Sequence, residues 1–393
     1  MKRPAPRAAG SVLAIWALLS LLLPAMAPVS AEAAPTSPAA PTDASPAPGG
    51  CPDRPTVQPG QAPVLAHFYI WFTSSSWNRA KTDFPAVGLY SSDQTNVMRT
   101  QVAQAREAGI DGFMVGWKST DTLNHRLAAL RGIAAESDFK LAITYQAQNF
   151  DRNPLPVAQV QRDLQELAAT YADDPVFHVV GPQPVVALSG TWHYTEEELR
   201  SITEPVASRL TVLATEKNVG GYERVAPAVE GELYYWSSVD PQNDGGYHNK
   251  LLAMANTVRE HCGIWVAPVT PGFDAREIGG RRIIDRRDGE TLRSSWQAAL
   301  ATVPDVIGVI SWNEFSENTH IEPSEQFGNR YLDVLAELTG APPPPAKELD
   351  SSASDVQGAG TPLRPTLMAA AALGSLLIVT AWGAGRRRRA TRP

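Results

Sequence analysis

The sequence predicts an α/β protein, with a single (β/α)8 barrel of the TIM type over residues 63–339, an N-terminal signal peptide and a C-terminal transmembrane helix. Eight short apolar segments alternate with amphipathic helical patterns, which is typical of a parallel sheet covered by helices. The length of 63–339 suits one such barrel. An open doubly wound sheet is the alternative, but no Gly-rich phosphate fingerprint follows the first predicted strand.

The barrel elements follow one another in regular order. Strands are expected at 64–70, 110–115, 140–145, 184–188, 210–214, 232–235, 264–269 and 306–310. Helical patterns between them include 96–108, 123–135, 157–171, 249–260 and 290–301. The segment 210–214 has the weakest strand pattern. Because consecutive strand–helix–strand units wind with one hand, a closed eightfold barrel is the simplest arrangement of these elements.

Residues 1–34 have the composition of a secretory signal peptide. Lys2, Arg3 and Arg7 form its positive end, 11–25 is apolar, and small residues at 29–31 offer a cleavage site. A transmembrane anchor is the alternative, but the apolar run is short for a span. The segments that follow are therefore expected outside the cytoplasm.

A second apolar segment, 366–385, holds 20 uncharged residues and is just long enough to cross a bilayer. The basic tail 386–393 follows, and basic residues favour the cytoplasmic side. Together with the signal peptide, this predicts a bacterial protein anchored in the cell membrane by one C-terminal helix, with the barrel outside. The alternative is a tail removed after sorting, although 363–366 resembles a wall-sorting signal only loosely.

Two biased stretches flank the barrel. Residues 35–62 are rich in Pro and Ala without any apolar period, as in a disordered spacer. Residues 340–365 contain four consecutive prolines at 342–345 and are expected to form a stalk. The barrel is thus expected to stand away from the membrane.

The formal charge of −7 conceals an asymmetry along the chain. Residues 35–363 hold 25 of the 34 basic residues and 40 of the 41 acidic ones, so their net charge is near −15. This charge argues against nucleic acid or anionic lipid as the ligand of the exported part. It suits a neutral substrate.

The chain has two cysteines, Cys51 and Cys262. In an oxidising compartment they could form a disulfide between the N-terminal extension and the barrel, but spacing alone leaves their pairing open. No Cys/His cluster has the spacing of zinc ligands. No metal or cofactor is expected.

Two glutamates, Glu314 and Glu317, follow the last predicted strand, beside aromatic side chains. Ligands of parallel α/β barrels bind at the carboxyl ends of the strands. Burial against aromatic rings raises the pKa of a carboxyl towards the value that a general acid needs. Glycoside hydrolysis uses such a pair, since one acid protonates the leaving oxygen while the other acts at the reacting centre. A solvated pair is the alternative, and Glu322 is either a third acid of the site or a residue that orients the turn.

The ends of the other predicted strands are rich in aromatic and polar residues. Aromatic faces stack on sugar rings, and amides and carboxylates bind sugar hydroxyls. Packing in the core or at the rim is the alternative for each aromatic residue, and His193 is either a sugar ligand or a packed histidine. The candidate substrate-binding residues are Tyr69, Trp71, Trp117, Trp192, His193, Tyr235, Trp236, Asp274, Trp312, Asn313 and Glu322.

At these residues the chain resembles glycoside hydrolase family 99, the endo-α-mannosidase family. The family's last strand is followed by a block like Ser-Trp-Asn-Glu-Trp-His-Glu-Gly-Thr-Gln-Ile-Glu, which matches 311–322. Residues 67–72, 90–93 with 108–113, and 270–274 resemble other parts of the family pattern. A more distant resemblance is to family 71, of α-1,3-glucanases, which has Asp in place of Glu314.

The family 99 resemblance implies that Glu317 is the general acid and later the base. It implies that Glu314 deprotonates the sugar 2-hydroxyl, giving a 1,2-anhydro sugar that water opens with retention. The family 71 resemblance instead implies that Glu314 activates water and that configuration inverts. The chain departs from the family 99 block at Phe315, Ser316 and Asn318, and 145–148 lacks the family's acidic substrate-binding residues.

We therefore expect a surface-anchored glycoside hydrolase that cleaves an α-linked polysaccharide, α-mannan or α-glucan, from within the chain. Its partner would be a polysaccharide or oligosaccharide and not a nucleic acid. The competing function is a non-catalytic carbohydrate-binding or wall-organising barrel. A serine hydrolase is disfavoured, because the sequence has no Gly-x-Ser-x-Gly elbow. The sugar, the linkage and the oligomeric state are left open by the sequence.

Overall fold

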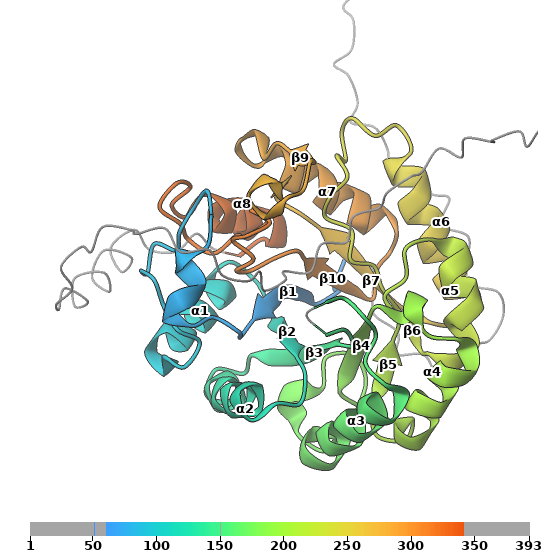
Figure 1. Ribbon diagram of the computed structural model, residues 1–393. Helices are drawn as coiled ribbons and strands as arrows, with labels where there is room; N and C mark the ends of the chain where they lie inside the picture. The colour runs from blue at the N-terminus through green and yellow to red at the C-terminus, as the bar shows by residue number, and fades with distance from the viewer. Residues whose placement is uncertain (1–50, 52–59, 150, 342–393) are drawn as a thin grey trace, which may run out of the picture. The chain divides into compact units, whose positions relative to one another are not determined.

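The computed structural model describes Cys51, residues 60–149 and residues 151–341 (Figure 1). The predicted signal peptide, the transmembrane segment and the basic tail lie outside the described residues, as do nearly all of the spacer and the stalk. Those assignments remain predictions. Within the described ranges, no helix is both long and apolar enough to cross a membrane.

Eight parallel strands form the centre of the domain, in the spatial order β5-β4-β3-β2-β1-β10-β7-β6. Every neighbouring pair in this sheet is parallel, with β1 lying between β2 and β10. The strands are β1 (Val64–Tyr69), β2 (Gly112–Trp117), β3 (Lys140–Gln146), β4 (Val185–Ser189), β5 (Thr211–Leu213), β6 (Gly231–Leu233), β7 (Ile264–Val269) and β10 (Val306–Val309).

The two end strands, β5 and β6, meet through a short contact. An isolated parallel bridge joins Ala214 to Glu232, and the Ala214 N–H donates to the Gly231 carbonyl over 2.8 Å. The sheet is therefore a nearly closed barrel. The prediction of a single eight-stranded parallel barrel is confirmed.

One helix of two or more turns follows each barrel strand and packs outside the sheet (Figure 1). They are α1 (Thr95–Glu107), α2 (Asp121–Glu136), α3 (Val157–Tyr171), α4 (Glu196–Thr203), α5 (Val219–Val225), α6 (Tyr247–Glu260), α7 (Glu290–Ala301) and α8 (Arg330–Thr339). Between β7 and α7 the chain adds an antiparallel pair, β8 (Phe273–Asp274) and β9 (Ile283–Ile284).

Most strand bounds agree with the sequence pattern, but β2 begins two residues later than predicted. Residues 110–111 are used for the turn out of α1, where Gly109 has φ +73° and the Asp111 carboxylate accepts the Val64 N–H over 2.8 Å. Gly112 then starts the strand, and a Cβ there would lie 2.4 Å from the Lys140 carbonyl oxygen. Only glycine permits this close approach of β2 to β3.

Side chains alternate between two packed layers, as the pleat of a strand requires. The barrel interior holds the apolar cluster that includes Leu65, Met114, Ala187, Leu233 and Val266. The alternate residues face the helices, and there they join one large core. Near the carboxyl ends of the strands the interior becomes polar, with His67, Thr144 and Gln146 all buried.

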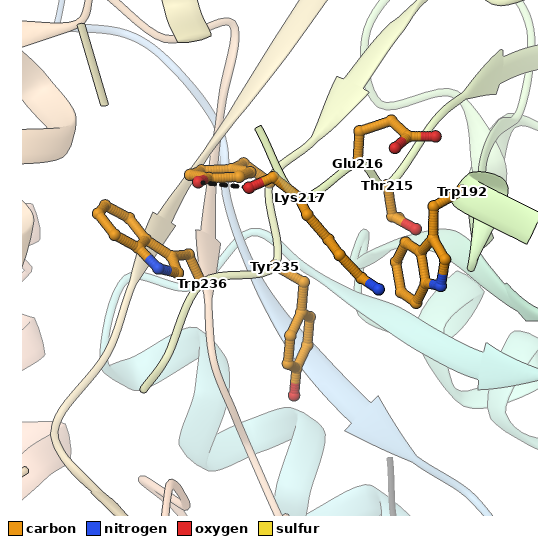
Figure 2. A pocket seen from close by; sticks show the side chains of 7 residues that line it. Trp192, Thr215, Glu216, Lys217, Tyr235 and Trp236 are labelled. Atoms are coloured by element: carbon orange, nitrogen blue, oxygen red, sulfur yellow. Dashed lines mark hydrogen bonds between the residues drawn. The ribbon is translucent and has the colours of Figure 1, made fainter. Parts of the chain in front are cut away.

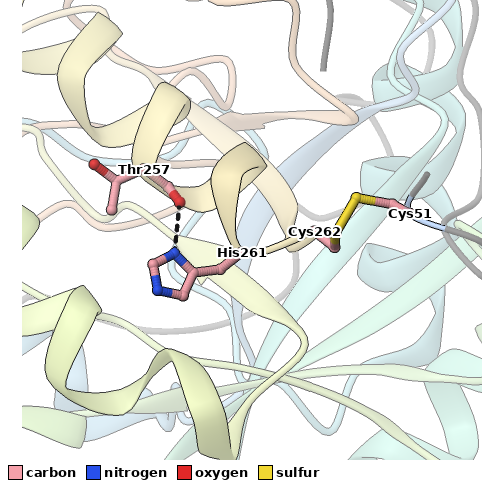
Figure 3. Close-up of a disulfide and its surroundings, with 4 residues drawn as sticks. All are labelled: Cys51, Thr257, His261 and Cys262. Carbon is pink, nitrogen blue, oxygen red and sulfur yellow. Dashed lines mark hydrogen bonds between the residues drawn. A yellow bond between two sulfur atoms is a disulfide. The ribbon is translucent and has the colours of Figure 1, made fainter. Parts of the chain in front are cut away.

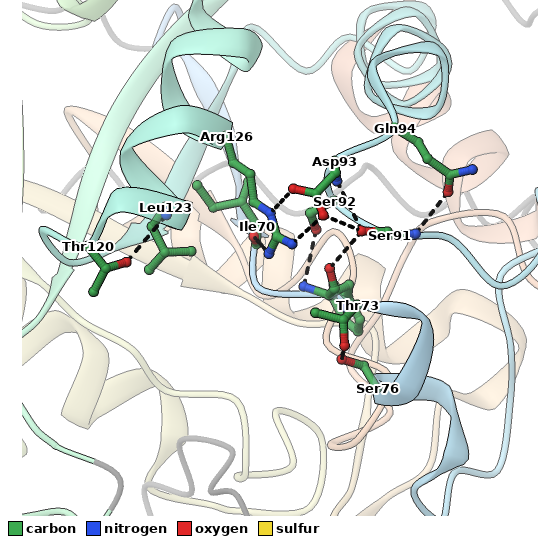
Figure 4. A network of polar contacts seen from close by, with 11 residues as sticks. Ile70, Thr73, Ser76, Ser91, Ser92, Asp93, Gln94, Thr120, Leu123 and Arg126 are labelled. Carbon is green, nitrogen blue, oxygen red and sulfur yellow. Dashed lines mark hydrogen bonds and ion pairs between the residues drawn. The ribbon is translucent and has the colours of Figure 1, made fainter.

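The chain that leaves β1 is held by a polar network (Figure 4). Arg126 of α2 donates to both carboxylate oxygens of Asp93, over 2.6 and 2.7 Å, and to the Ile70 carbonyl over 2.9 Å. Ser92 pairs with Phe72 through its amide and its hydroxyl. The Arg126 guanidinium lowers the pKa of Asp93 to about 2, so the ion pair persists at neutral pH and fixes the end of β1.

A disulfide joins Cys51 to Cys262, 211 residues apart in the sequence (Figure 3). Cys262 lies just after α6, where the adjacent His261 ring bonds to the Thr257 carbonyl. The bond therefore attaches the segment that precedes the barrel to the turn that leads into β7.

Removing this disulfide is expected to destabilise the barrel. Closing so long a loop restricts the unfolded chain, so Cys51→Ser with Cys262→Ser should lower the free energy of unfolding by about 2–5 kcal/mol. Thermal or denaturant unfolding measures the loss. Either single substitution should give nearly the full effect, and two titratable thiols in the unreduced wild type would contradict the bond.

Candidate active site

Glu314 and Glu317 lie in the loop 311–322, which leaves the carboxyl end of β10 and folds back on itself. The Ser311 N–H donates to the Thr319 carbonyl over 2.9 Å, and the Thr319 N–H returns to the Glu314 carbonyl over 3.2 Å. The Ile321 N–H donates to the Ser311 carbonyl. The loop is thus a compact turn that holds both carboxylates at the face where barrel ligands bind.

Glu314 is 3% exposed and has partners that favour its charged form. The Ser316 N–H donates to its Oε1 over 3.0 Å, and its own amide donates to the Ser311 hydroxyl. Burial raises the pKa of Glu314, but the Ser316 amide and the Lys81 ammonium oppose this rise. The Ser316 amide and the Lys81 ammonium therefore favour a negative charge on Glu314.

Glu317 is 2% exposed and its surroundings favour the proton. Its Oε1 is buried without a hydrogen-bond partner among the described residues. Burial and the neighbouring Glu314 carboxylate raise the pKa of Glu317 well above its ordinary value, against a weaker opposing effect of Arg152. The Asp274 N–H fixes the Glu317 backbone by donating to its carbonyl over 2.8 Å.

The two acids are thus distinguished by their surroundings. Two carboxyls in one desolvated site resist double ionisation, so a charge on one raises the pKa of the other. The groups around Glu314 stabilise a carboxylate, whereas Glu317 has the more strongly raised pKa. The arrangement can supply a proton donor and a proton acceptor at the same time.

Two predicted residues, Tyr69 and Tyr235, meet beside the acid pair. Their hydroxyls lie 2.8 Å apart. Burial raises the pKa of both phenols, and both glutamates raise them further, so the hydroxyls remain protonated. Below them the buried His67 ring meets the Tyr235 ring edge-on, with centroids 4.9 Å apart.

Asn313 and Glu322 bind protein groups. Asn313 accepts the Tyr69 N–H over 2.8 Å and donates to the Tyr69 carbonyl over 3.0 Å. Glu322 accepts from the Tyr90 hydroxyl over 2.9 Å and from Gln101 over 2.7 Å. Burial raises the pKa of Glu322 to about 8. These contacts tie the glutamate loop to β1 and α1; substrate contact by Asn313 or Glu322 stays a prediction.

A pocket opens at the ends of β4, β5 and β6 (Figure 2). The Lys217 ammonium lies over the Trp192 ring, 4.0 Å from its centroid, and Trp236 stacks on Tyr247 with centroids 4.7 Å apart. The wall therefore combines aromatic side chains with the Lys217 ammonium and with the Glu216 carboxylate, which is paired with Arg224 over 3.1 Å. The lining residues are Trp192, Thr215, Glu216, Lys217, Tyr234, Tyr235 and Trp236.

Trp71 is partly exposed and stacks on Tyr69, with centroids 4.2 Å apart. The Tyr69 ring packs against β2 at Gly116, where a Cβ would lie 2.7 Å from the ring. His193 is exposed and adjoins Trp192, which lines the pocket. These positions are compatible with contact to a ligand.

Three further predicted residues have protein partners. Trp117 is buried on the helix side of β2, where its indole N–H donates to Asn124 over 2.9 Å. Trp312 is fully buried near Phe113. Asp274 forms an ion pair with Arg276 over 2.7 Å. The structure therefore assigns packing or pairing contacts to them and leaves their role in substrate binding untested.

Sequence reasoning missed His67, Lys81, Glu216 and Lys217. His67 lies two residues before Tyr69, so strand alternation could have placed it inside the barrel. Glu216 and Lys217 follow β5, the strand with the weakest pattern, after which no residue was proposed. No local pattern marks Lys81. Among the described side chains, no group of three or more His, Cys, Asp or Glu is arranged to hold a metal ion.

Comparisons with known proteins identify the family of this chain. The family model for glycosyl hydrolase family 99 matches residues 61–336. A glycoprotein endo-α-1,2-mannosidase-like protein of Mus musculus is 21% identical over 282 residues, 64% of this chain and 61% of the relative. The Rattus norvegicus glycoprotein endo-α-1,2-mannosidase is 20% identical over 277 residues, 64% of this chain and 59% of the relative. The chain thus spans about three fifths of these relatives' length.

A solved structure shows the same fold. The family 99 endo-α-mannosidase of Bacteroides thetaiotaomicron superposes with a TM-score of 0.61 at 17% identity, covering 70% of this chain and 96% of that one. This likeness supports the architecture alone, whereas the family model covers the whole barrel from β1 into α8. The chain therefore belongs to glycoside hydrolase family 99.

Proposed function

We propose that this chain hydrolyses α-mannosidic linkages within a polysaccharide, using Glu317 as general acid and base and Glu314 as the base for the sugar 2-hydroxyl. The observation that carries the proposal is the unequal setting of the two buried acids. Glu317 has the more strongly raised pKa, while Glu314 has an amide and a nearby ammonium that favour its charge. A pair with these properties supplies both proton transfers of the reaction.

In the first step, Glu314 takes the proton of the 2-hydroxyl, and that oxygen attacks C1. The bond from C1 to the leaving oxygen breaks as Glu317 gives its proton to that oxygen. The product is a 1,2-anhydro sugar. In the second step, the Glu317 carboxylate takes a proton from water, the hydroxide adds to C1, and the 2-oxygen recovers its proton from Glu314. Two displacements at C1 give retention.

The substrate class rests on the family and on the pocket. The curated relatives are named endo-α-1,2-mannosidases, so α-1,2-linked mannan is the first substrate to test. Trp192 and Trp236 line the pocket beside Tyr235, and the Lys217 ammonium over the Trp192 ring can meet a sugar hydroxyl. This wall is the surface proposed to contact a sugar unit next to the one being cleaved.

Inversion is the second outcome, drawn from the family 71 resemblance, in which Glu314 would activate water directly. The first-formed anomer, followed by NMR, separates the two mechanisms. α-Glucans belong in the same substrate panel. Binding of a glycan without any turnover would favour the carbohydrate-binding alternative.

Glu317→Gln should lower kcat on an α-1,2-mannan by about 10²–10⁴-fold, because the leaving oxygen loses its proton donor. KM should change little, since the amide keeps the shape of the side chain. Reducing-end release measures turnover, and calorimetry with a mannan fragment measures binding. Glu314→Gln should cause a comparable loss.

Glu325→Gln is the matched control, because Glu325 is an exposed glutamate a few residues further along the same segment. It should retain wild-type turnover. Cleavage that survives Glu317→Gln at the wild-type rate would show that another group donates the proton.

The pH dependence of activity should be bell-shaped. It is lost as pH falls through the pKa of Glu314, because the base is then protonated, and lost as pH rises through the pKa of Glu317, because the acid is then ionised. Burial raises both pKa values, so both limbs should lie above the ordinary carboxyl value of about 4.3. The pH profile of kcat/KM measures them.

An activated aryl α-mannoside needs no proton on its leaving group. With that substrate Glu317→Gln should lose the alkaline limb of the glycosylation step and keep the acidic one. An alkaline limb of unchanged position in the variant would contradict the assignment of Glu317.

We also propose that the barrel is exported and anchored at the cell surface through 366–385. The disulfide supports an oxidising compartment. In a bacterial host the full chain should sediment with membranes and be cut by protease added to intact cells, while a chain ending at residue 365 should appear in the medium or periplasm. A full-length protein in the cytosolic fraction, with two free thiols, would contradict the proposal.

A further inference from the structure

We propose that Asp83, His320 and Arg286 form a clamp that positions the glutamate loop for the reaction, with His320 neutral and its proton on Nε2. The inference rests on the proposed roles of Glu314 and Glu317. The three residues come from segments far apart in the sequence. They meet on the side of loop 311–322 that faces α8 and the segment before α1. They are positioning residues, because none is assigned contact with substrate.

Asp83 connects the loop to the chain that follows β1. Its Oδ2 lies 2.9 Å from His320 Nε2, and its Oδ1 accepts the amides of Phe84 and Gln326 over 2.8 and 2.9 Å. Burial alone would raise the pKa of Asp83, but hydrogen bonds, led by that from His320, hold it below its ordinary value. Asp83 is therefore a carboxylate that accepts from the His320 ring and from two backbone amides.

Arg286 fastens the other side of the same turn. Its Nη2 donates to the carbonyls of Asn318 and His320, over 2.9 and 2.8 Å. Its guanidinium lies over the rings of Phe327 and Tyr331, 4.5 and 4.4 Å from their centroids. Burial lowers the pKa of Arg286 to about 10, so it remains a cation at neutral pH. The buried Arg286 cation therefore has backbone carbonyls that follow Glu317 as its acceptors.

These neighbours fix the state of His320. Its Nδ1 lies 3.5 Å from Arg286 Nη2, which is only a donor, and its Nε2 faces the Asp83 carboxylate, which is only an acceptor. Burial and the Arg286 cation lower the pKa of His320 to about 4. The ring is then neutral, with its proton directed at Asp83.

The clamp reaches the acids through Phe315 and the backbone. The His320 ring stacks on Phe315 with centroids 4.0 Å apart, and Phe315 directly follows Glu314. The Arg286 bond to Asn318 holds the residue after Glu317, where the backbone has φ +52°. Because a displacement of about 1 Å can cost a factor of ~10² in rate, a turn fixed on both sides is a requirement of the chemistry.

Three variants test the clamp on α-1,2-mannan. His320→Gln keeps a donor for Asp83 but loses the ring on Phe315. His320→Phe keeps the ring but loses the donor. Arg286→Met keeps the packing between the rings but loses both bonds to the loop. Each should lower kcat by about 10–100-fold with KM within about twofold, since the acids are displaced while the sugar pocket is intact.

Rescue and control variants separate positioning from general destabilisation. Arg286→Lys keeps a donor and a charge, so it should recover part of the rate lost in Arg286→Met. Adding Asp83→Asn to His320→Phe removes the stranded carboxylate and should recover thermal stability without recovering kcat. Val160→Ala, which opens a cavity in the core beneath α3, should lower the melting temperature and leave kcat unchanged.

Two outcomes overturn the clamp. The first is wild-type kcat in all three variants while the wild-type enzyme cleaves mannan. The second is an unchanged titration of the acids, and it is the test to use if the wild type cleaves no mannan, since the proposed function then fails on its own. Carboxyl ¹³C NMR follows the titration of Glu314 and Glu317 in the wild type and in the variants. Curves unchanged in His320→Phe and Arg286→Met would reject the clamp, and displaced curves would support it.

Discussion

The site depends on one electrostatic constraint, that two carboxyl groups share a space from which water is largely removed. Neither Glu314 nor Glu317 is more than 3% exposed, so the cost of a second negative charge there is high. The amide of Ser316 and the ammonium of Lys81 favour charge on one side of the pair. The backbone bonds within the loop keep this inequality in place, because they fix Glu314 next to the Ser316 amide and hold the Glu317 backbone against Asp274.

The polar residues near the pair divide between holding the loop and forming the wall of the site. Asn313 and Glu322 join the loop to the ends of β1 and α1. Asp83 and Arg286 hold its far side. Tyr69, Tyr235, Trp71, His193 and the pocket beside Trp192 have positions compatible with contact to a ligand. Much of the polarity at this end of the barrel therefore serves orientation, as expected when proton transfers need fixed distances.

The barrel and the position of the two glutamates could be predicted because both depend on patterns between residues close together in the sequence. Apolar strands and amphipathic helices have clear periods, and Glu314 and Glu317 share one turn after a strand. The partners of that turn could not be predicted, because Asp83 and Arg286 are brought to it by tertiary packing over more than 30 residues of sequence in each case. Trp117 and Trp312 show the converse: each lies near a strand end, as the pattern required, yet the pleat turns its ring into the core.

Two contacts fasten the ends of the described barrel. Cys51 is bonded to the turn just before β7, and Thr339, at the end of α8, donates to the Ala108 carbonyl in the turn that leads into β2. Both attachments lie at the amino ends of parallel strands, the face opposite the glutamates. The face that carries Glu314 and Glu317 is therefore free of both attachments.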